Sequence, residues 1–107
     1  MAERRRFKRV GVSIFIDVFV QGDLKTRGRG VISDLSLGGM ALETKEDLGI
    51  GNVLILRFNL DANNLIDLKG KIVRKEKQPA LIKYGIQFIK IGFFVKLKLK
   101  NFIVVHM

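Results

Sequence analysis

The sequence contains no cysteine, no tryptophan, one proline and one histidine in 107 residues. Without cysteine, the chain has no disulfide, no thiolate metal ligand and no cysteine nucleophile. This absence fits a reducing compartment, and we expect a cytoplasmic protein. The longest apolar runs, Ile91–Val95 and Phe102–Val105, are far shorter than the roughly 18 residues of a membrane span. No apolar stretch follows the first charges, which predicts that there is no secretory signal.

Catalytic chemistry has little support. The single histidine, His106, is the penultimate residue, so Ser13, Ser33 and Ser36 have no plausible histidine partner. The carboxylates are scattered and show no metal-ligand spacing. The sequence has no Walker-type phosphate loop and no dinucleotide fingerprint. We therefore expect a binding protein, with no catalytic residue, metal or cofactor.

Negative charge is scarce, because 20 Lys and Arg face only 10 Asp and Glu, for a net charge of +10. Such a charge predicts an anionic partner: a nucleotide, a nucleic acid, or an acidic membrane or protein surface. The alternative is simply a solvated surface. Five basic groups lie within residues 3–9, without hydrophobic periodicity. We expect residues 1–9 to form a flexible basic arm unless an anion orders it.

The rest of the chain fits a single domain over residues 1–107. From Val10 to Val20, every second residue is Val or Ile, a period of two that predicts a β-strand. The alternate positions carry Phe15 and Phe19, and we expect another element to cover these two rings partly.

Further strands are predicted at intervals along residues 10–89. Their ranges are 26–33, 40–42, 53–60, 65–75 and 84–89, with turns at 21–23, 34–39 and 48–52 and a hairpin loop at 61–64. Several strands at this spacing indicate a closed barrel or a sandwich.

Residues 91–105 show two conflicting patterns. Val95–Lys100 alternates strictly, which is typical of a strand, whereas Ile91, Val95, Leu99, Phe102 and Ile103 share one helical face. Leu and Lys also favour helix. The sequence therefore predicts a helix that packs on the barrel.

The basic arm is the first candidate binding segment. Arg5 and Arg9 lie four residues apart, and the planar fork of a guanidinium suits phosphate, the O6/N7 edge of guanine and the face of a base. A nonspecific electrostatic arm or a solvated tail is the alternative.

The second candidate segment is Asp34-Leu35-Ser36-Leu37-Gly38-Gly39. Asp34 and Ser36 can cap the backbone of a turn, or accept and donate hydrogen bonds to a base or phosphate. Gly39 has no Cβ, so a ligand or another backbone can approach it closely. An ordinary connection between two strands is the alternative.

Together, the two segments resemble the PilZ domain family. The segment Arg5-Arg6-Phe7-Lys8-Arg9 matches its RxxxR motif, and residues 34–39 match its D/NxSxxG motif. Residues 70–74 and 84–88 resemble later strands of the family. The resemblance implies a mainly all-β fold, a six-stranded antiparallel β-barrel with a C-terminal α-helix.

PilZ domains typically bind cyclic di-GMP, a bacterial second messenger. The resemblance implies that Arg5 and Arg9 grip the phosphates and guanine edges, and that Asp34, Ser36 and Gly39 line the opposite wall.

Three more arginines receive roles from the same resemblance. Arg4 precedes the RxxxR motif, where the family associates an arginine with the uptake of two stacked ligand molecules. Arg6 is expected to add a contact. Arg74 lies where some relatives offer a side chain for base stacking.

The sequence therefore predicts a receptor or adaptor whose arm closes over cyclic di-GMP and changes the surface shown to an unidentified effector protein. Two alternatives are a PilZ-like interaction module that does not bind the nucleotide, and a small barrel that binds single-stranded nucleic acid. One Tyr and no Trp make the last less favoured, because such barrels stack bases on exposed aromatic side chains.

Overall fold

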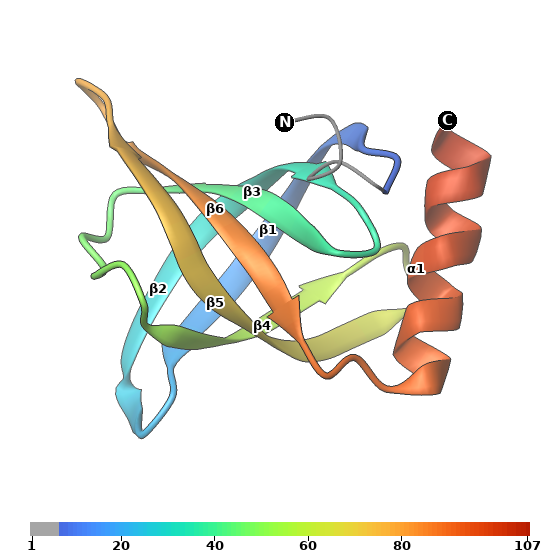
Figure 1. The fold of residues 1–107 in the computed structure, drawn as a ribbon, viewed down its shortest axis with the longest axis horizontal. Coiled ribbons are helices and arrows are strands. Elements are labelled where there is room, and N and C mark those ends of the chain that lie inside the picture. The colour runs from blue at the N-terminus through green and yellow to red at the C-terminus, as the bar shows by residue number, and fades with distance from the viewer. Residues whose placement is uncertain (1–6) are drawn as a thin grey trace.

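The structure, a computed structural model, describes residues 7–107, apart from the side chains of residues 23–27 (Figure 1). Its elements are β1 (Val10–Val20), β2 (Asp23–Leu35), β3 (Gly39–Thr44), β4 (Val53–Asn59), β5 (Leu65–Lys77), β6 (Ile82–Ile89) and α1 (Phe93–His106). Each strand pairs antiparallel with its neighbours, and the order β1-β2-β3-β6-β5-β4 closes on itself. The predicted six-stranded antiparallel barrel with a C-terminal helix is confirmed.

The barrel interior holds the apolar residues that the period of two selects. On β5, the alternation buries Ile66, Leu68, Gly70 and Ile72 and leaves the residues between them exposed. On β1, the predicted inner face is buried or packs against the core; its members are Val10, Val12, Ile14, Ile16, Val18 and Val20. Removing this apolar surface from water is the main driving force for closing the barrel.

The outer face of β1 differs from the prediction. Phe15 is 85% exposed, so the expected partial cover of this ring is wrong. Phe19 is half-buried, with the guanidinium of Arg57 5.7 Å from its ring centroid. The difference arises because β1 pairs with β2 and β4 within the wall, and only a long neighbouring side chain such as Arg57 can reach over a ring there.

The connection between β2 and β3 is shorter than the predicted turn at 34–39. Asp34 still belongs to β2, where it pairs with Gly11 of β1 and Ala41 of β3, and Gly39 is the first residue of β3. Only residues 36–38 connect the strands. Ladder hydrogen bonds to both neighbouring strands extend the sheet into residues whose local preference is for a turn.

Residues 93–106 form the predicted helix, so the strand pattern of Val95–Lys100 does not decide the fold. Leu99 and Ile103 are buried, and Val95 and Phe102 pack beside them. A helix buries these four side chains together, whereas the alternation would have placed Leu97 with them; Leu97 is exposed instead. No helix within residues 7–107 is long and apolar enough to cross a membrane.

Candidate functional site

One hollow of about 700 Å³ forms where the chain enters β1, beside the β2–β3 connection and across the outer faces of β5 and β6. We call it the Arg9 hollow. Its volume lies within the roughly 300–1,000 Å³ that is typical of small-molecule sites. The residues that line it are Phe7, Arg9, Ser36, Gly38, Gly39, Val73, Arg74, Gly85, Ile86, Gln87 and Phe88.

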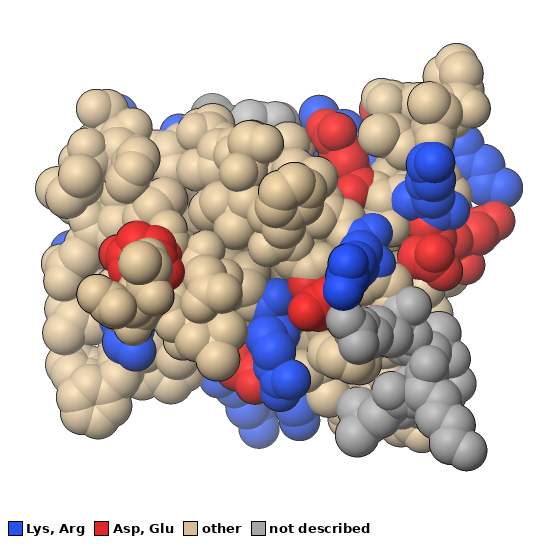
Figure 2. Space-filling view, turned by 180° about the vertical axis from the view of Figure 1, so that it is seen from behind, with Lys and Arg blue, Asp and Glu red and all other residues tan. Residues whose placement is uncertain are grey.

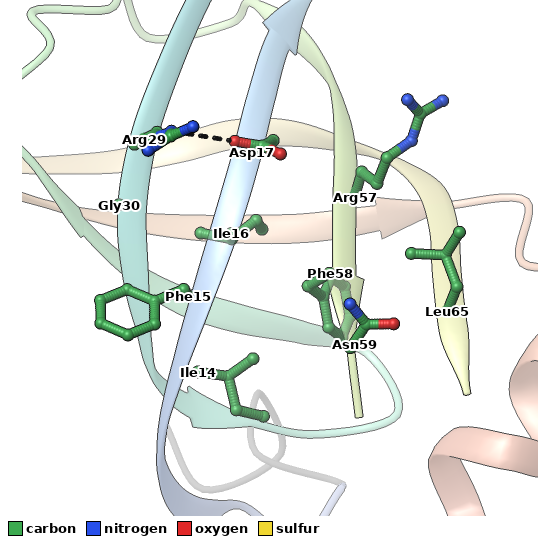
Figure 3. A pocket seen from close by; sticks show the side chains of 10 residues that line it. All are labelled: Ile14, Phe15, Ile16, Asp17, Arg29, Gly30, Arg57, Phe58, Asn59 and Leu65. Atoms are coloured by element: carbon green, nitrogen blue, oxygen red, sulfur yellow. Dashed lines mark ion pairs between the residues drawn. The ribbon is translucent and has the colours of Figure 1, made fainter. Parts of the chain in front are cut away.

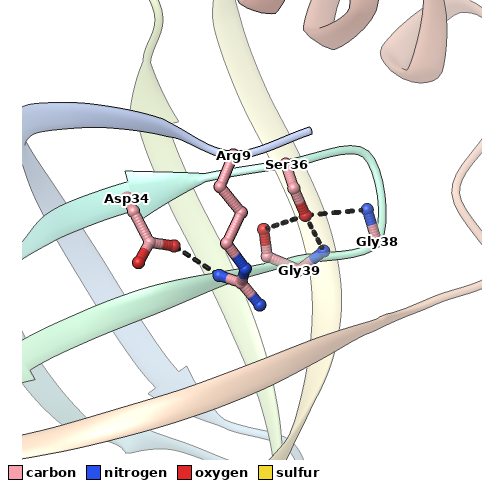
Figure 4. A network of polar contacts seen from close by, with 5 residues as sticks. All are labelled: Arg9, Asp34, Ser36, Gly38 and Gly39. Atoms are coloured by element: carbon pink, nitrogen blue, oxygen red, sulfur yellow. Dashed lines mark hydrogen bonds and ion pairs between the residues drawn. The ribbon is translucent and has the colours of Figure 1, made fainter. Parts of the chain in front are cut away.

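Arg9 and Asp34 form an ion pair at the edge of this hollow (Figure 4). The Nη1 of Arg9 donates to Oδ1 of Asp34 at 2.5 Å, and each side chain is about one-third exposed. The register explains the contact: Arg9 directly precedes β1, whose residue Gly11 pairs with Asp34 on β2. A strong donor and a strong acceptor are thus held together at the rim, where a ligand can reach both.

Ser36 builds the wall of the hollow. Its hydroxyl oxygen accepts hydrogen bonds from the backbone N–H groups of Gly38 and Gly39, and the hydroxyl donates to the carbonyl oxygen of Gly39 (Figure 4). The side chain is buried. Because the turn already uses the hydroxyl as donor and acceptor, the structure favours the capping interpretation of Ser36 over direct contact with a base or phosphate.

Both glycines at the end of the 34–39 segment lie against other parts of the protein. A Cβ on Gly39 would lie 2.1 Å from the carbonyl oxygen of Ile86 on the paired strand β6. A Cβ on Gly38 would lie 2.7 Å from the ring of Phe7. Of the two approaches that the sequence left open at Gly39, the backbone approach is the one observed. Gly38 gives Phe7 a flat surface on which the chain reaches β1.

Arg74 reaches the opposite side of the hollow through a β-bulge. The pairing of β5 with β6 shifts between Ile72 and Arg74, so that Ile72 faces Ile86 and Arg74 faces Gly85. The Arg74 side chain lies across Gly85, where a Cβ would be 3.1 Å from it. A bulge re-aims side chains, and here Val73 and Arg74 both line the hollow.

The structure thus brings four of the predicted residues to one hollow: Arg9, Ser36, Gly39 and Arg74, with Asp34 bonded to the first. The predicted contacts of Arg4, Arg5 and Arg6 lie outside the described residues.

Sequence reasoning missed the other seven lining residues: Phe7, Gly38, Val73, Gly85, Ile86, Gln87 and Phe88. A glycine inside a predicted strand often marks a close approach, and at Gly85 this signal points to the site.

A second hollow, of about 590 Å³, lies on the outer wall over β1, β2 and β4 (Figure 3). We call it the Phe15 hollow. It also contains arginines, but acidic side chains accompany them: Arg29 lies 3.6 Å from Asp17, and Arg57 lies 2.9 Å from Asp67. Paired cations of this kind belong to cross-strand stabilisation.

The Arg9 hollow differs because Arg74 makes no ion pair with any residue of the described part of the chain. No group of three or more metal-ligating side chains occurs among residues 7–107.

A sequence model of the PilZ domain matches residues 3–104, nearly the whole chain. The protein belongs to the PilZ domain family. Comparison of the sequence with curated proteins gives no match.

Several solved structures share the fold at low sequence identity. The PilZ domain with c-di-GMP of YcgR from Escherichia coli aligns with a TM-score of 0.81 and 16% identity, over 96% of this chain and 91% of that chain. The Bacillus subtilis inhibitor of motility MotI/DgrA gives 0.79 and 17%, over 95% of this chain and 50% of its own.

The K. pneumonia MrkH–c-di-GMP complex gives a TM-score of 0.76 and 17% identity, over 94% of this chain and 51% of that chain. The present chain therefore spans about half the length of MotI/DgrA and of MrkH.

Proposed function

We propose that this protein is a receptor for cyclic di-GMP and binds the nucleotide in the Arg9 hollow. The observation that carries the proposal is the convergence of both family motifs on that hollow. Arg9 ends the first motif, Ser36 and Gly39 belong to the second, and all three line one space of ligand size. The related domains of YcgR and MrkH, which have been solved with c-di-GMP, support the choice of ligand.

The Arg9–Asp34 pair suits a purine nucleotide that carries phosphates. An anionic ligand can take the guanidinium of Arg9 from Asp34, and the N1–H and amino group of guanine can then donate to the freed carboxylate. One exposed ion pair is replaced by two sets of charge-assisted hydrogen bonds, which are stronger than neutral ones. The pair therefore holds both groups ready for the ligand without an unpaired charge beforehand.

Arg74 supplies the other side of the proposed site. Its Nε and Nη2 atoms lie beside Gly85, 3.2 and 3.1 Å from where a Cβ would be, and a planar guanidinium is a surface on which a base can stack. Because no carboxylate among the described side chains pairs with it, Arg74 also adds positive charge where two phosphodiesters must bind. In this proposal Ser36 and Gly39 shape the wall, and Arg9, Asp34 and Arg74 contact the ligand.

The basic arm, with Arg4, Arg5 and Arg6, closes over the bound nucleotide in this proposal. Phe7, near the end of the arm, lies on Gly38 at the rim of the hollow, and Arg4, Arg5 and Arg6 directly precede it in the sequence. Closing the arm costs about 1–2 kcal/mol per ordered residue, and the ligand's charge offsets this cost. The closed arm changes the surface presented to an effector protein, and the protein acts as an adaptor without a cofactor or catalytic turnover.

Isothermal titration calorimetry with cyclic di-GMP tests the binding, with cyclic di-AMP as the control. Adenine lacks the O6 acceptor and the N1–H donor of guanine, so only the guanine ligand should bind at micromolar concentration. The absence of heat with cyclic di-GMP, from protein shown to be folded by circular dichroism, would contradict the proposal. It would favour the interaction-module alternative. A gel shift of single-stranded nucleic acid that cyclic di-GMP does not compete would favour the nucleic-acid alternative.

A separate measurement tests the arm. Because the chain has no cysteine, Glu3→Cys gives one labelling position for a nitroxide spin label. We expect the spectrum to broaden when cyclic di-GMP is added, as the arm becomes ordered. Binding by calorimetry with an unchanged spectrum would refute the closing arm and leave the receptor proposal intact.

A further inference from the structure

Helix α1 is apolar on two opposite faces, and the barrel covers only one of them. Leu99 and Ile103 are buried in the core. On the other side, five large side chains are exposed by 44–77%; they are Phe93, Phe94, Leu97, Val104 and Val105, which we call the α1 ridge. Exposed apolar side chains that gather on one face commonly mark an interaction site, so the α1 ridge is expected to have a partner.

The spacing places the members of the α1 ridge along one side of the helix, with Lys100 and Asn101 between Leu97 and Val104. Phe93, Leu97 and Val104 follow one another at steps of four and seven residues, which align along one side of a helix. Phe94 and Val105 lie beside this line, and the rings of Phe93 and Phe94 touch edge to face, with centroids 5.5 Å apart. In Figure 1, α1 stands at the edge of the molecule with its outer side turned away from the barrel.

Positive charge borders the α1 ridge on both sides. Lys96 and Lys100 follow one flank and Lys98 follows the other, and all three are exposed. Helix α1 contains no Asp or Glu. The edge of the molecule where α1 lies, at the left of Figure 2, is largely tan, with isolated blue groups and one red group that does not belong to α1. This combination of an apolar stripe with flanking lysines points to an occupant that is apolar within and negative at its surface.

These charges argue against a second copy of the chain as the occupant. Packing two α1 ridges together would bring the lysines of both helices close to one another, and α1 offers no carboxylate to pair with them. Like charges so placed are destabilising. The ridge is also convex, so a folded protein would need a matching groove, whereas a lipid interface deforms around it.

We propose that α1 lies in the interface of a membrane rich in anionic lipid. The Phe, Leu and Val side chains of the ridge enter the headgroup–acyl boundary, and the flanking lysines extend to the lipid phosphates. The net charge of +10 attracts the rest of the molecule to the same surface. This attachment rests on α1 alone and does not depend on nucleotide binding.

Vesicle sedimentation tests the proposal. The full chain is mixed with vesicles of phosphatidylcholine alone, or with about one-third phosphatidylglycerol. We expect binding to the anionic vesicles only. Phe93→Ser with Phe94→Ser keeps the charge and should weaken binding by about tenfold or more, since two exposed rings lose their burial in lipid. The matched control is Phe15→Ser, which removes an equally exposed ring from the barrel wall and should change binding less than about twofold.

A charge reversal examines the lysines in the same assay. Lys100→Glu should weaken binding more than Lys45→Glu, an exposed lysine in the loop between β3 and β4. Leu97→Trp adds an emission probe, since the chain has no Trp. Its fluorescence should shift to the blue on anionic vesicles and be quenched by brominated lipid.

Several results would overturn the proposal. Absence of binding to the anionic vesicles would do so, and would leave an acidic protein or a second copy as the occupant; analytical ultracentrifugation identifies the latter. Binding that survives Phe93→Ser with Phe94→Ser would show only electrostatic adsorption. An indole emission of the Leu97→Trp variant that does not shift on bound vesicles would show the same.

Discussion

The two hollows on the barrel wall have similar volumes, about 700 and 590 Å³, and both contain arginines. They differ in what the arginines do. At the Phe15 hollow, Arg29 pairs with Asp17 (Figure 3). Arg57 pairs with Asp67, a residue just outside the hollow. In the Arg9 hollow, a single carboxylate, Asp34, pairs with Arg9. Volume and arginine count are therefore alike in the two hollows, and the balance of charge is what distinguishes them.

Glycines border both hollows, and these glycines differ in which atoms lie where a Cβ would be. Gly30 of the Phe15 hollow faces the backbone carbonyl oxygen of Glu43, 2.6 Å from its Cβ position. The Arg9 hollow is bordered by Gly38, Gly39 and Gly85, each of which has a neighbour where a Cβ would be. At Gly38 and Gly85 these neighbours are the side chains of Phe7 and Arg74. At these two positions, the absence of a Cβ leaves room for the side chains of Phe7 and Arg74 at the rim of the Arg9 hollow.

The largest contrast is expected from removing one arginine from each hollow. Arg9→Ala should weaken cyclic di-GMP binding by about 100-fold or more, because it removes a charge-assisted contact and leaves Asp34 to repel the ligand. Arg57→Ala should change the affinity by less than about twofold. Calorimetry measures both affinities. If both variants lost the same amount of cyclic di-GMP affinity, the Arg9 hollow could not be distinguished from the Phe15 hollow as the binding site.

A glycine substitution tests the close approach of Gly39 on β3 to Ile86 on β6. Gly39→Ala should destabilise the fold by about 3 kcal/mol or more, because its Cβ has no room beside the carbonyl oxygen of Ile86. Gly11→Ala is the control, with nothing within 4 Å of its Cβ position, and should stay within about 1 kcal/mol of the parent. Urea unfolding gives both values, and similar stabilities would be inconsistent with the close β3–β6 approach.

Arg74, which makes no ion pair with any described residue, allows a test with a smaller expected effect. Arg74→Ala should weaken cyclic di-GMP binding by about tenfold, which is the loss of one stacking surface. The paired Arg29 of the Phe15 hollow is the control, and Arg29→Ala should have almost no effect. If Arg74→Ala binds like the parent, Arg74 has no part in the site.

The smallest effect concerns a third group of paired charges. Hydrogen bonds from Lys75 and Lys77 hold the pKa of Asp47 below its ordinary value. A lowered carboxyl pKa stabilises the fold above the unfolded-state pKa, and this contribution is lost as the pH falls through the folded-state pKa.

Asp47→Asn should therefore lower the melting temperature slightly at pH 7, and the difference should vanish in acid. Cyclic di-GMP affinity at pH 7 should be unchanged, since Asp47 does not line the Arg9 hollow. A difference in melting temperature that persists undiminished in acid would refute this assignment.

The strands were predictable where one face is buried. The period of two from Val10 to Val20 requires an interior and an exterior, and the barrel supplies both. The exposure of Phe15 was not predictable, because alternation does not say whether another element covers the outer face. The helix was ambiguous for the same reason: Val95–Lys100 fits a strand until the barrel offers Leu99 and Ile103 a place to pack.

The sequence motifs predicted which residues belong to the candidate site, but they did not predict how these residues contact one another. Arg9 and Asp34 are 25 residues apart, and their contact follows from the pairing of Gly11 with Asp34. The reason for Gly39 lies at Ile86 on another strand, which the motif itself does not contain. The bulge that brings Arg74 to Gly85 depends on strand register, which sequence spacing does not fix.

The most direct measurement is a nuclear magnetic resonance titration of the ¹⁵N-labelled protein with cyclic di-GMP. We predict shifts of the amide signals of Gly38, Gly39, Arg74 and Gln87, and no change at Arg29 or Arg57. Shifts that cluster at the Phe15 hollow, or a spectrum that saturating ligand leaves unchanged, would contradict the assignment of the Arg9 hollow as the nucleotide site.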